Sequence, residues 1–566
     1  MKNFRNSILL FLLFLPWLNM RGETHIDYFN GRPLVVANGS PILILAGELG
    51  NSTATTPEDI KINMLSAKRG GLNTVLVPVY WDLMEPKQGE FDFSLIDAII
   101  DTARETDLKL GILWFGAWKN SMSCYAPEWV KTNLSEYARA RTSSGNPLEI
   151  LSVFDPKVLK VDLTAFETLL NHIKEYDREG NVVLIQVENE IGMLEEARDY
   201  SFLAEKEYHK GVPGQLMEAL NKNKERLHPS LENKWKVNGN KMSGTWIEVF
   251  GDDIFTDEYF MAWNYGKYVE VLTAKGKQIL PVVYYVNGAL NSRDRKPGEY
   301  PSAGPLAHLK DIWHAAAPSL DFISPDIYDS GFEDWVEQYA LEDNILFVPE
   351  IKREKANQAQ AYYIIGHHDA LGISPFSIEN GDESYFSELS SAYQVLNELT
   401  PILVNQEEKR FKEGVILTAE KPSTILEDDE MKITISHFFT LPWDPRAKDK
   451  NNWKPSGGIL LNISPGEYIL AGSGLVAKFE HVSENSSIQQ LGEDGFALKG
   501  ESANNIKSTN GSKRIGLAKV QEIKVNSDGS YTNVRTFNGD ETHQGRHVRI
   551  TPDEHKILHI KTYTYE

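Results

Sequence analysis

VVLIQVENEIG (residues 182–192) passes abruptly from a nearly continuous apolar run to two carboxylates separated by one amide. Such a run is typical of a strand that is buried on both faces, as strands in parallel sheets are. The polar residues that follow then lie at the carboxyl end of the strand, where parallel α/β proteins place their reactive groups. This segment therefore predicts a parallel sheet with a functional site at its edge.

Seven further apolar runs alternate with amphipathic stretches of helical periodicity, which predicts a closed (β/α)8 barrel with insertions. A doubly wound open sheet is the alternative. The predicted strands are 42–48, 73–80, 109–116, 182–188, 279–286, 321–327, 345–349 and 371–377. The predicted helices are 57–69, 94–106, 164–176, 256–275, 332–341 and 384–400.

The pattern changes near residue 400 to short alternating runs separated by Gly, Asn and Asp turns, which is typical of an all-β, sandwich-like domain. Its predicted strands lie within 431–439, 457–463, 467–480, 547–550 and 556–565. The predicted domains are a signal peptide (1–22), a catalytic barrel (23–398) and a C-terminal β-sandwich-like domain (399–566). We expect the longest insertion, 193–255, to form a wall above the barrel, and the polar stretch 483–514 to be an exposed loop.

The net charge is -22, from 58 basic and 80 acidic side chains. This balance opposes binding to nucleic acid or to an anionic membrane and suits a neutral substrate. The single cysteine, Cys124, excludes an internal disulfide and a cysteine-based metal site. His367 and His368 are adjacent, so on a helix they diverge by about 100° and do not predict a metal site. No metal or other cofactor is expected.

The N-terminus resembles a secretory signal, because Lys2 and Arg5 precede the short apolar stretch ILLFLLFLPWL (8–18). We therefore expect an exported, soluble protein, periplasmic or extracellular, without stable membrane insertion once the signal is removed. An uncleaved membrane anchor is the alternative. The oligomeric state is not predicted by anything in the sequence.

Two carboxylates end strands on opposite sides of the predicted barrel mouth: Glu190 follows the fourth strand and Glu350 the seventh. Glycoside hydrolysis needs such a pair, and a separation of roughly 5–5.5 Å leads to retention of configuration. Two structural carboxylates held in salt bridges are the alternative.

Two motifs resemble those of glycoside hydrolase family 35, the β-galactosidases. They are QVENEIG (186–192) and NTVLVPVYWDLMEPKQGEFDF (73–93), and the resemblance covers roughly 30–395. It implies that Glu190 is the acid/base, that Glu350 is the nucleophile and that Asn189 binds the sugar 2-OH. It also implies a retaining, exo-acting β-galactosidase whose partner is an oligosaccharide or polysaccharide.

Further sugar contacts are expected at the strand ends, from Glu48, Tyr80 and Trp81. In the clan that contains this family, a tyrosine often hydrogen-bonds the nucleophile, which points to Tyr328. A buried core tyrosine is the alternative for this residue.

One segment departs from the family. Many members carry a G-P-Y-I-x-A-E-W type segment after the third strand, where this chain has LWFGAWKNSMSCYAPEWV (113–130). Lys119 and Asn120 then replace a carboxylate as hydroxyl partners, and Trp114 or Trp118 stacks on a sugar face. The change resembles a bacterial branch with its own C-terminal β-domain, some members of which act on galactosyl side chains of plant xyloglucan.

Three alternatives to a β-galactosidase stay open at this point. The barrel could act on another β-sugar (a glucoside, mannoside or arabinoside), or it could bind carbohydrate without catalysis. A structural or adhesive surface protein is the third, and it predicts no deep pocket at the strand ends.

Overall fold

The computed structural model describes residues 24–291, 295–441, 443–483 and 513–565. The predicted signal peptide and nearly all of the predicted 483–514 loop lie outside this part of the chain. None of the described helices is long and apolar enough to cross a membrane.

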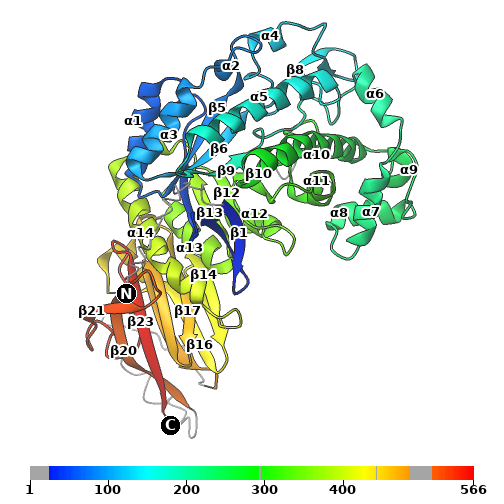
Figure 1. The fold of residues 1–566 in the computed structure, drawn as a ribbon. Coiled ribbons are helices and arrows are strands. Elements are labelled where there is room, and N and C mark those ends of the chain that lie inside the picture. The colour runs from blue at the N-terminus through cyan, green and yellow to red at the C-terminus, as the bar shows by residue number, and fades with distance from the viewer. Residues whose placement is uncertain (1–23, 292–294, 442, 484–512, 566) are drawn as a thin grey trace, which may run out of the picture.

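Eight parallel strands close into a barrel, which confirms the predicted fold (Figure 1). In order around the barrel they are β4 (Ile44–Glu48), β5 (Thr74–Tyr80), β6 (Lys109–Phe115), β9 (Val182–Gln186), β10 (Val283–Ala289), β11 (Phe322–Ile327), β12 (Val348–Ile351) and β13 (Gly372–Pro375). Nearly every residue of these strands is buried, which explains why they are continuous apolar runs in the sequence. The largest shift from prediction is at β10, because the preceding helix continues to Ile279.

All six predicted helices are present. They are α1 (Pro57–Lys68), α3 (Ser94–Thr106), α5 (Pro156–Tyr176), α10 (Ile254–Ile279), α12 (Phe332–Tyr339) and α14 (Glu383–Asn405). However, α5 begins eight residues before its predicted start at 164 and α14 ends five residues after its predicted end at 400. Side-chain caps start several of the six helices; Asp155, for example, accepts from the Lys157 backbone N–H ahead of α5. The predicted domain boundary at 398/399 falls inside α14.

Two barrel helices were not predicted, α11 (Lys310–Ala316) and α13 (Asn357–His367). Helix α13 is buried on nearly all sides, because the C-terminal domain covers the face that a barrel helix normally exposes. Its sequence therefore lacks the polar stripe that identifies an amphipathic helix. The contact is close: a Cβ on Gly366 would lie 2.6 Å from the Cα of Gly414.

A three-stranded antiparallel sheet, also not predicted, precedes the barrel. It consists of β1 (Thr24–Phe29), β2 (Arg32–Ala37) and β3 (Ser40–Ile42), and it leads directly into β4. The insertion after β9 forms α6 (Phe202–Tyr208), α7 (Gly214–Lys222), α8 (Pro229–Val237) and α9 (Trp246–Phe250). In Figure 1 these four helices form a lobe on the far side of the barrel from the C-terminal domain.

The C-terminal domain is all-β, as predicted, with two antiparallel sheets. The larger has the order β14 (Lys412–Leu417), β17 (Ser456–Ser464), β18 (Glu467–Ser473), β23 (Lys556–Tyr565), β20 (Arg514–Val525) and β21 (Tyr531–Thr536). The smaller has the order β15 (Ser423–Asp428), β16 (Met431–His437), β19 (Leu475–His481) and β22 (Val548–Ile550). Residues of both sheets, such as Leu460 and Ile433, share one apolar core.

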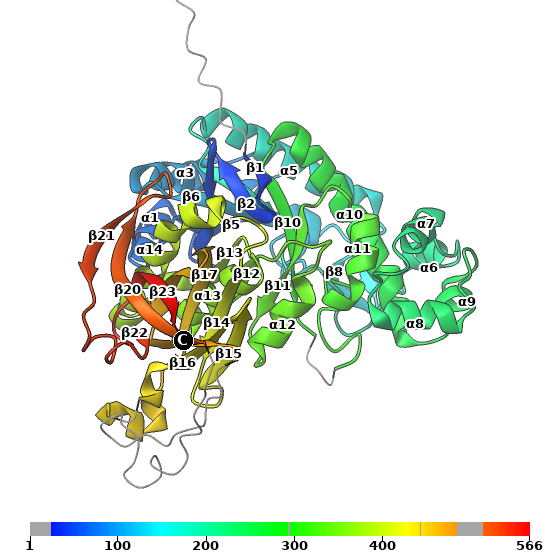
Figure 2. The same ribbon diagram turned by 90° about the horizontal axis from the view of Figure 1, so that it is seen from below.

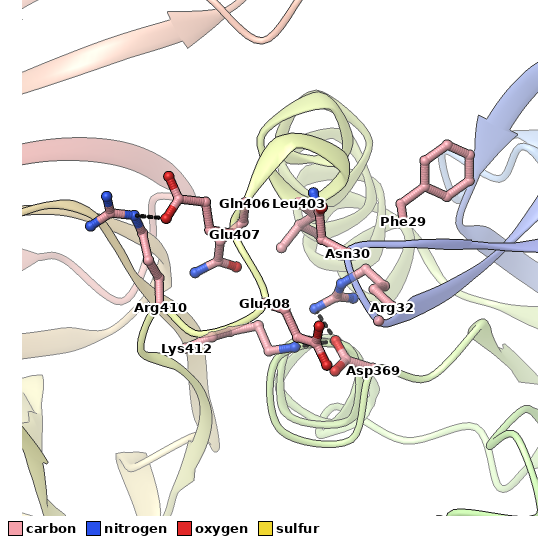
Figure 3. Close-up of a pocket in the computed structure, with 11 residues that line it drawn as sticks. Phe29, Asn30, Arg32, Asp369, Leu403, Gln406, Glu407, Glu408, Arg410 and Lys412 are labelled. Atoms are coloured by element: carbon pink, nitrogen blue, oxygen red, sulfur yellow. Dashed lines mark hydrogen bonds and ion pairs between the residues drawn. The ribbon is translucent and has the colours of Figure 1, made fainter.

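A cavity of about 160 Å³ lies where the β1–β2 turn, the end of α14 and the start of β14 meet (Figure 3). On its wall Arg32 and Lys412 both pair with the carboxylate of Asp369. Arg32 also donates to the Ile365 carbonyl at 3.0 Å. Burial lowers the pKa of Arg32 and of Lys412, and Asp369 opposes this effect. The three charges therefore connect the barrel to the C-terminal domain.

Removing the shared carboxylate should destabilise this junction. Asp369→Asn leaves the nearly buried Arg32 without its counter-ion, so we expect a loss of roughly 2–3 kcal/mol, below the 3–5 kcal/mol typical of a fully buried pair. Urea denaturation followed by circular dichroism measures this loss. Glu383→Gln is the control, since its pair with Arg69 is exposed and contributes about 0–1 kcal/mol. Equal denaturation midpoints for the two variants would contradict this role.

Candidate active site

Three carboxylates from the ends of three barrel strands meet at the barrel mouth. Glu190 follows β9, Asp326 lies in β11 and Glu350 in β12, and all three are buried. One oxygen from each lies within 4.8 Å of the others. At so short a spacing, a negative charge on one group makes the other two harder to ionise.

The backbone at Glu190 is held in an uncommon conformation. Glu188 and Glu190 have φ angles of 60° and 45°, a region that non-glycine residues enter at a cost of about 1–3 kcal/mol. Backbone hydrogen bonds from Asn120 to Asn189 (3.2 Å) and from Ser121 to Glu190 (3.1 Å) compensate for it. The strained turn therefore aims Glu190 into the barrel mouth.

Two donors from the loop after β6 meet Glu190. The ammonium of Lys119 lies 3.5 Å from Glu190 Oε2, and Asn120 Nδ2 donates to the same oxygen. On the other side, the Glu190 backbone N–H donates to Asn287 Oδ1 at 3.1 Å. The amide of Asn287 in turn donates to Asp326 at 2.6 Å, so it connects the Glu190 backbone to the Asp326 carboxylate.

Glu350 has one oxygen held and one free. Tyr328 Oη donates to Oε1, whereas the buried Oε2 has no hydrogen-bond partner among the described residues. Burial and the Glu190 carboxylate raise the pKa of Glu350 to about 7, and Lys119 and Tyr328 oppose this shift. Because Glu190 is one of the causes, this pKa belongs to the last proton of the pair.

Lys119 is a buried cation among four carboxyl groups. Burial, followed by the charge of Glu350, raises the pKa of both Glu48 and Asp326 well above their ordinary values. Burial opposes the charge on Lys119, but Glu190 and Glu350 outweigh it and raise the pKa of the ammonium. Glu48 and Asp326 therefore ionise less readily than they would in water, whereas Lys119 keeps its proton more readily.

Several buried polar atoms at the strand ends lack a partner among the described residues. They are both amide atoms of Asn189, Glu350 Oε2, Asp326 Oδ1, Glu48 Oε1 and the Tyr285 hydroxyl. Buried polar groups are normally satisfied, so a concentration of unsatisfied ones indicates a place for water or a polar ligand. Asn120 and Tyr328, which are exposed, stand at the mouth above these atoms.

A second pair of carboxyl groups supports the loop after β6 from below. Glu188 Oε2 accepts from the Trp118 backbone N–H at 2.8 Å. Next to it, Asp162 of α5 accepts from Trp114 Nε1 at 3.0 Å and from the Tyr268 hydroxyl at 2.7 Å. Burial raises the pKa of both Glu188 and Asp162. The pair fixes the backbone from which Lys119 and Asn120 extend.

The aromatic residues expected to contact sugar lie in the core instead. Trp81, Trp114 and Trp118 have no exposed surface, so none offers a free ring face. Trp81 donates to Glu85 at 2.8 Å, and Trp118 packs edge-on against Tyr268. Tyr80 is 2% exposed, and its hydroxyl accepts from the Ala54 backbone N–H at 3.3 Å.

The structure brings together Glu48, Asn189, Glu190, Tyr328, Glu350 and Asn120. It adds Asp326 and Asn287, which the sequence analysis did not single out. Both lie near the ends of barrel strands, in SPDIY (324–328) and YVNGA (285–289). The criterion that identified Glu190 and Glu350, a polar residue directly after an apolar run, would have found them.

His367 and His368 do not join Glu379 or Asp382. His367 pairs with Glu413 of the C-terminal domain instead. Among the described residues, the Glu190–Asp326–Glu350 group alone has metal-ligand spacing. The ammonium of Lys119 already lies beside these oxygens, so a cation there would meet repulsion.

Residues 34–245, which carry β4 to β9 and the Glu190 turn, match glycosyl hydrolases family 35. The match covers 212 of the 566 residues of the chain. Residues 389–549, from α14 to β22, match a second family, described as a domain of unknown function (DUF5597).

Curated proteins similar to this chain include Beta-galactosidase 8 of Oryza sativa subsp. japonica, 27% identical over 35% of this chain and 29% of the relative. Beta-galactosidase-1-like protein 3 of Homo sapiens is 28% identical over 30% of this chain and 25% of the relative. The matched region thus spans less than a third of either relative.

Among solved structures, the chain is similar to a GH42 beta-galactosidase from G. stearothermophilus, with a TM-score of 0.45, 15% identity, and 64% of this chain and 58% of that chain covered. A beta-galactosidase from Bacillus circulans sp. alkalophilus gives a TM-score of 0.42 and 16% identity, with 63% of this chain and 56% of that chain covered.

Replacing Lys119 should change the ionisation of Glu350. Lys119→Met keeps an unbranched side chain but removes the charge that lowers the Glu350 pKa, together with the cation–π contact to Phe115. We therefore expect the Glu350 pKa to rise above 7, by roughly 1–3 units. Titration of the ¹³C carboxyl signals of labelled glutamate measures it, with the Glu350 signal assigned from Glu350→Gln.

Lys131→Met is the control, because Lys131 is an exposed lysine of the same loop that donates to the Cys124 carbonyl. It should leave the Glu350 titration unchanged. An unshifted Glu350 pKa in Lys119→Met would show that the ammonium does not govern the carboxylates.

Proposed function

We propose that this protein is a retaining, exo-acting β-galactosidase with Glu350 as nucleophile and Glu190 as acid/base. The observation that carries the proposal is the buried pair itself, with oxygens within 4.8 Å and one free oxygen on Glu350. A binding protein would gain nothing from bringing two carboxylates so close, because each makes the other harder to ionise. The match of residues 34–245 to glycosyl hydrolases family 35 and the names of the curated relatives support the galactoside.

The proposed first step uses the two glutamates on opposite sides of the glycosidic bond. Glu350 Oε2 attacks the anomeric carbon while Tyr328 holds Oε1, and a covalent glycosyl-enzyme forms. Glu190 gives its proton to the leaving oxygen. The ester that results removes the charge from Glu350, so Glu190, now ionised, accepts a proton from water, which releases the sugar with its original configuration.

The remaining groups position the sugar. The unpartnered amide of Asn189 suits the 2-OH, and Glu48 and Asn120 suit other ring hydroxyls. Because the carboxyl groups of this chain supply both the nucleophile and the proton, the proposed reaction needs no cofactor. We further propose export of the chain and, as substrate, terminal galactose on an oligosaccharide or polysaccharide such as xyloglucan.

The two roles can be separated with nitrophenyl β-galactoside and azide. Glu350→Ala should lose turnover and Glu190→Ala should lose roughly 10²–10⁴-fold, whereas Glu342→Ala, an exposed carboxylate paired with Arg226, should keep it. Azide should restore turnover in both site variants. It takes the place of Glu350 to give the α-galactosyl azide, and it takes the place of water in Glu190→Ala to give the β-galactosyl azide.

Proton NMR of the products distinguishes the two anomers. The same anomer from both variants would refute the assigned roles. Faster release of nitrophenol from a β-glucoside, mannoside or arabinoside than from the galactoside would refute galactose as the preferred sugar. It would leave the proposed mechanism intact.

The pH dependence follows from the shared proton. The active free enzyme needs one proton on the glutamate pair, and that proton is lost as the pH rises through the Glu350 pKa of about 7. We therefore expect kcat/KM to fall above about pH 7, since this parameter reports the free enzyme. A pH–rate profile that stays flat to pH 9 would contradict it.

A further inference from the structure

An aromatic lobe projects from the C-terminal domain between β16 and β17. We use this name for residues 438–441 and 443–455, which include the short helices η3 (Phe438–Thr440), η4 (Pro445–Lys448) and η5 (Lys450–Asn452). The lobe has a small apolar cluster separate from the domain core, formed by Phe438, Phe439 and Val476 with Leu441, Ala447 and Trp453 packed around it. It is therefore a folded feature and offers a defined surface.

The lobe is fixed to the catalytic side of the barrel. Gln358 Nε2 donates to the Pro455 carbonyl at 2.7 Å, and Lys454 forms an ion pair with Glu388 at 2.5 Å. Gln358 lies at the start of α13 and Glu388 in the second turn of α14. These helices follow β12 and β13, so their first turns lie at the end of the barrel where the strands deliver Glu350.

The view from below agrees with these contacts. In Figure 2 the lobe, coloured ochre, extends on the side of the molecule opposite the β1–β2 hairpin, which precedes the first barrel strand. The hairpin marks the amino-terminal end of the strands, so the lobe lies toward their carboxyl-terminal end.

Trp443 is the exposed aromatic of the lobe. Its side chain is 38% exposed, although it rests edge-on against the buried Phe438 at 5.9 Å between ring centroids. The guanidinium of Arg549 lies 5.2 Å from the Trp443 ring centroid, and one of its nitrogens donates to the Asp540 carbonyl at 3.0 Å. The ring is thus held by an edge-on contact with Phe438 and by the guanidinium of Arg549 over one of its faces.

This combination suits a neutral sugar. An indole provides a flat apolar area for the C–H face of a pyranose, and a guanidinium donates to its hydroxyl oxygens. The carboxylates of the same region are compensated, because Arg446 pairs with both Asp444 and Asp553. With a net charge of -22 on the chain, an anionic polymer would be repelled.

We propose that Trp443, with Arg549, binds backbone sugars of a neutral polysaccharide while one of its terminal galactose units occupies the barrel site. This inference rests on the proposed function and adds that the substrate is a polymer. Trp443 would then contribute to the binding of a polymer but not to the binding of a small glycoside.

The Trp443→Ala variant tests this proposal when its activities on two substrates are compared. With nitrophenyl β-galactoside, kcat/KM should be unchanged, because this substrate does not reach the lobe. With a galactosylated xyloglucan, kcat/KM should fall roughly three- to tenfold, the range expected for one aromatic contact. Tyr563→Ala is the control, since Tyr563 is an exposed aromatic on β23 and should affect neither substrate.

Unfolding of the aromatic lobe must be distinguished from the loss of the Trp443 ring alone. Trp443→Phe keeps the packing on Phe438 and should show an intermediate loss on polymer, and melting temperatures of all variants should be compared. Equal effects on both substrates, or no effect on the polymer, would overturn the proposal.

A second measurement does not depend on turnover. In affinity electrophoresis through gel that contains the same xyloglucan, Glu350→Ala should be retarded, and the double variant with Trp443→Ala should be retarded less. Equal retardation of the single and the double variant would also overturn the proposal. Wild-type protein that hydrolyses no β-glycoside would instead refute the proposed function, and the electrophoresis would still decide whether Trp443 binds sugar.

Discussion

The burial of four carboxyl groups around one ammonium is the constraint on which the site depends. Charges of one sign in a low-dielectric interior cannot all persist, so protons must remain on most of these groups. Lys119 compensates for one negative charge and lies nearest to Glu190, while Tyr328 supports Glu350. The proposed reaction depends on this partial protonation, because it needs one ionised and one protonated glutamate at the same time.

Holding such a cluster together requires stability from elsewhere. The positive φ angles at Glu188 and Glu190 and the unpaired polar atoms are local costs, and they persist because the surrounding contacts leave no alternative. Below the loop, Asp162 joins α5, α10 and β6 through hydrogen bonds to Trp114 and Tyr268. The buried tryptophans therefore act as rigid supports for the residues that face the ligand.

The barrel could be predicted from sequence because each strand is buried on both faces and appears as an apolar run. Helix α13 could not, because its outer face is covered by β14 and β17, which lie far away in sequence. The directions in which the Trp81 and Trp118 side chains point could not be predicted either. Both follow barrel strands, as Glu190 does, but packing against Trp129 and Tyr268 turns their rings into the core. Proximity to a strand end predicts a residue's position and not the direction of its side chain.

The C-terminal domain can both support the barrel and extend its site, because one interface serves both purposes. β14 and β17 replace solvent on the outer face of α13, and the Arg32–Asp369–Lys412 group closes the lower end of this contact. At the upper end, the chain passes from β16 of the smaller sheet to β17 of the larger sheet, and this connection is the aromatic lobe. Since the lower contacts fix the sheet relative to α13, they also fix where Trp443 lies relative to Glu350. A domain that was only a support would need no exposed indole at that turn, and this is the feature that favours the second role.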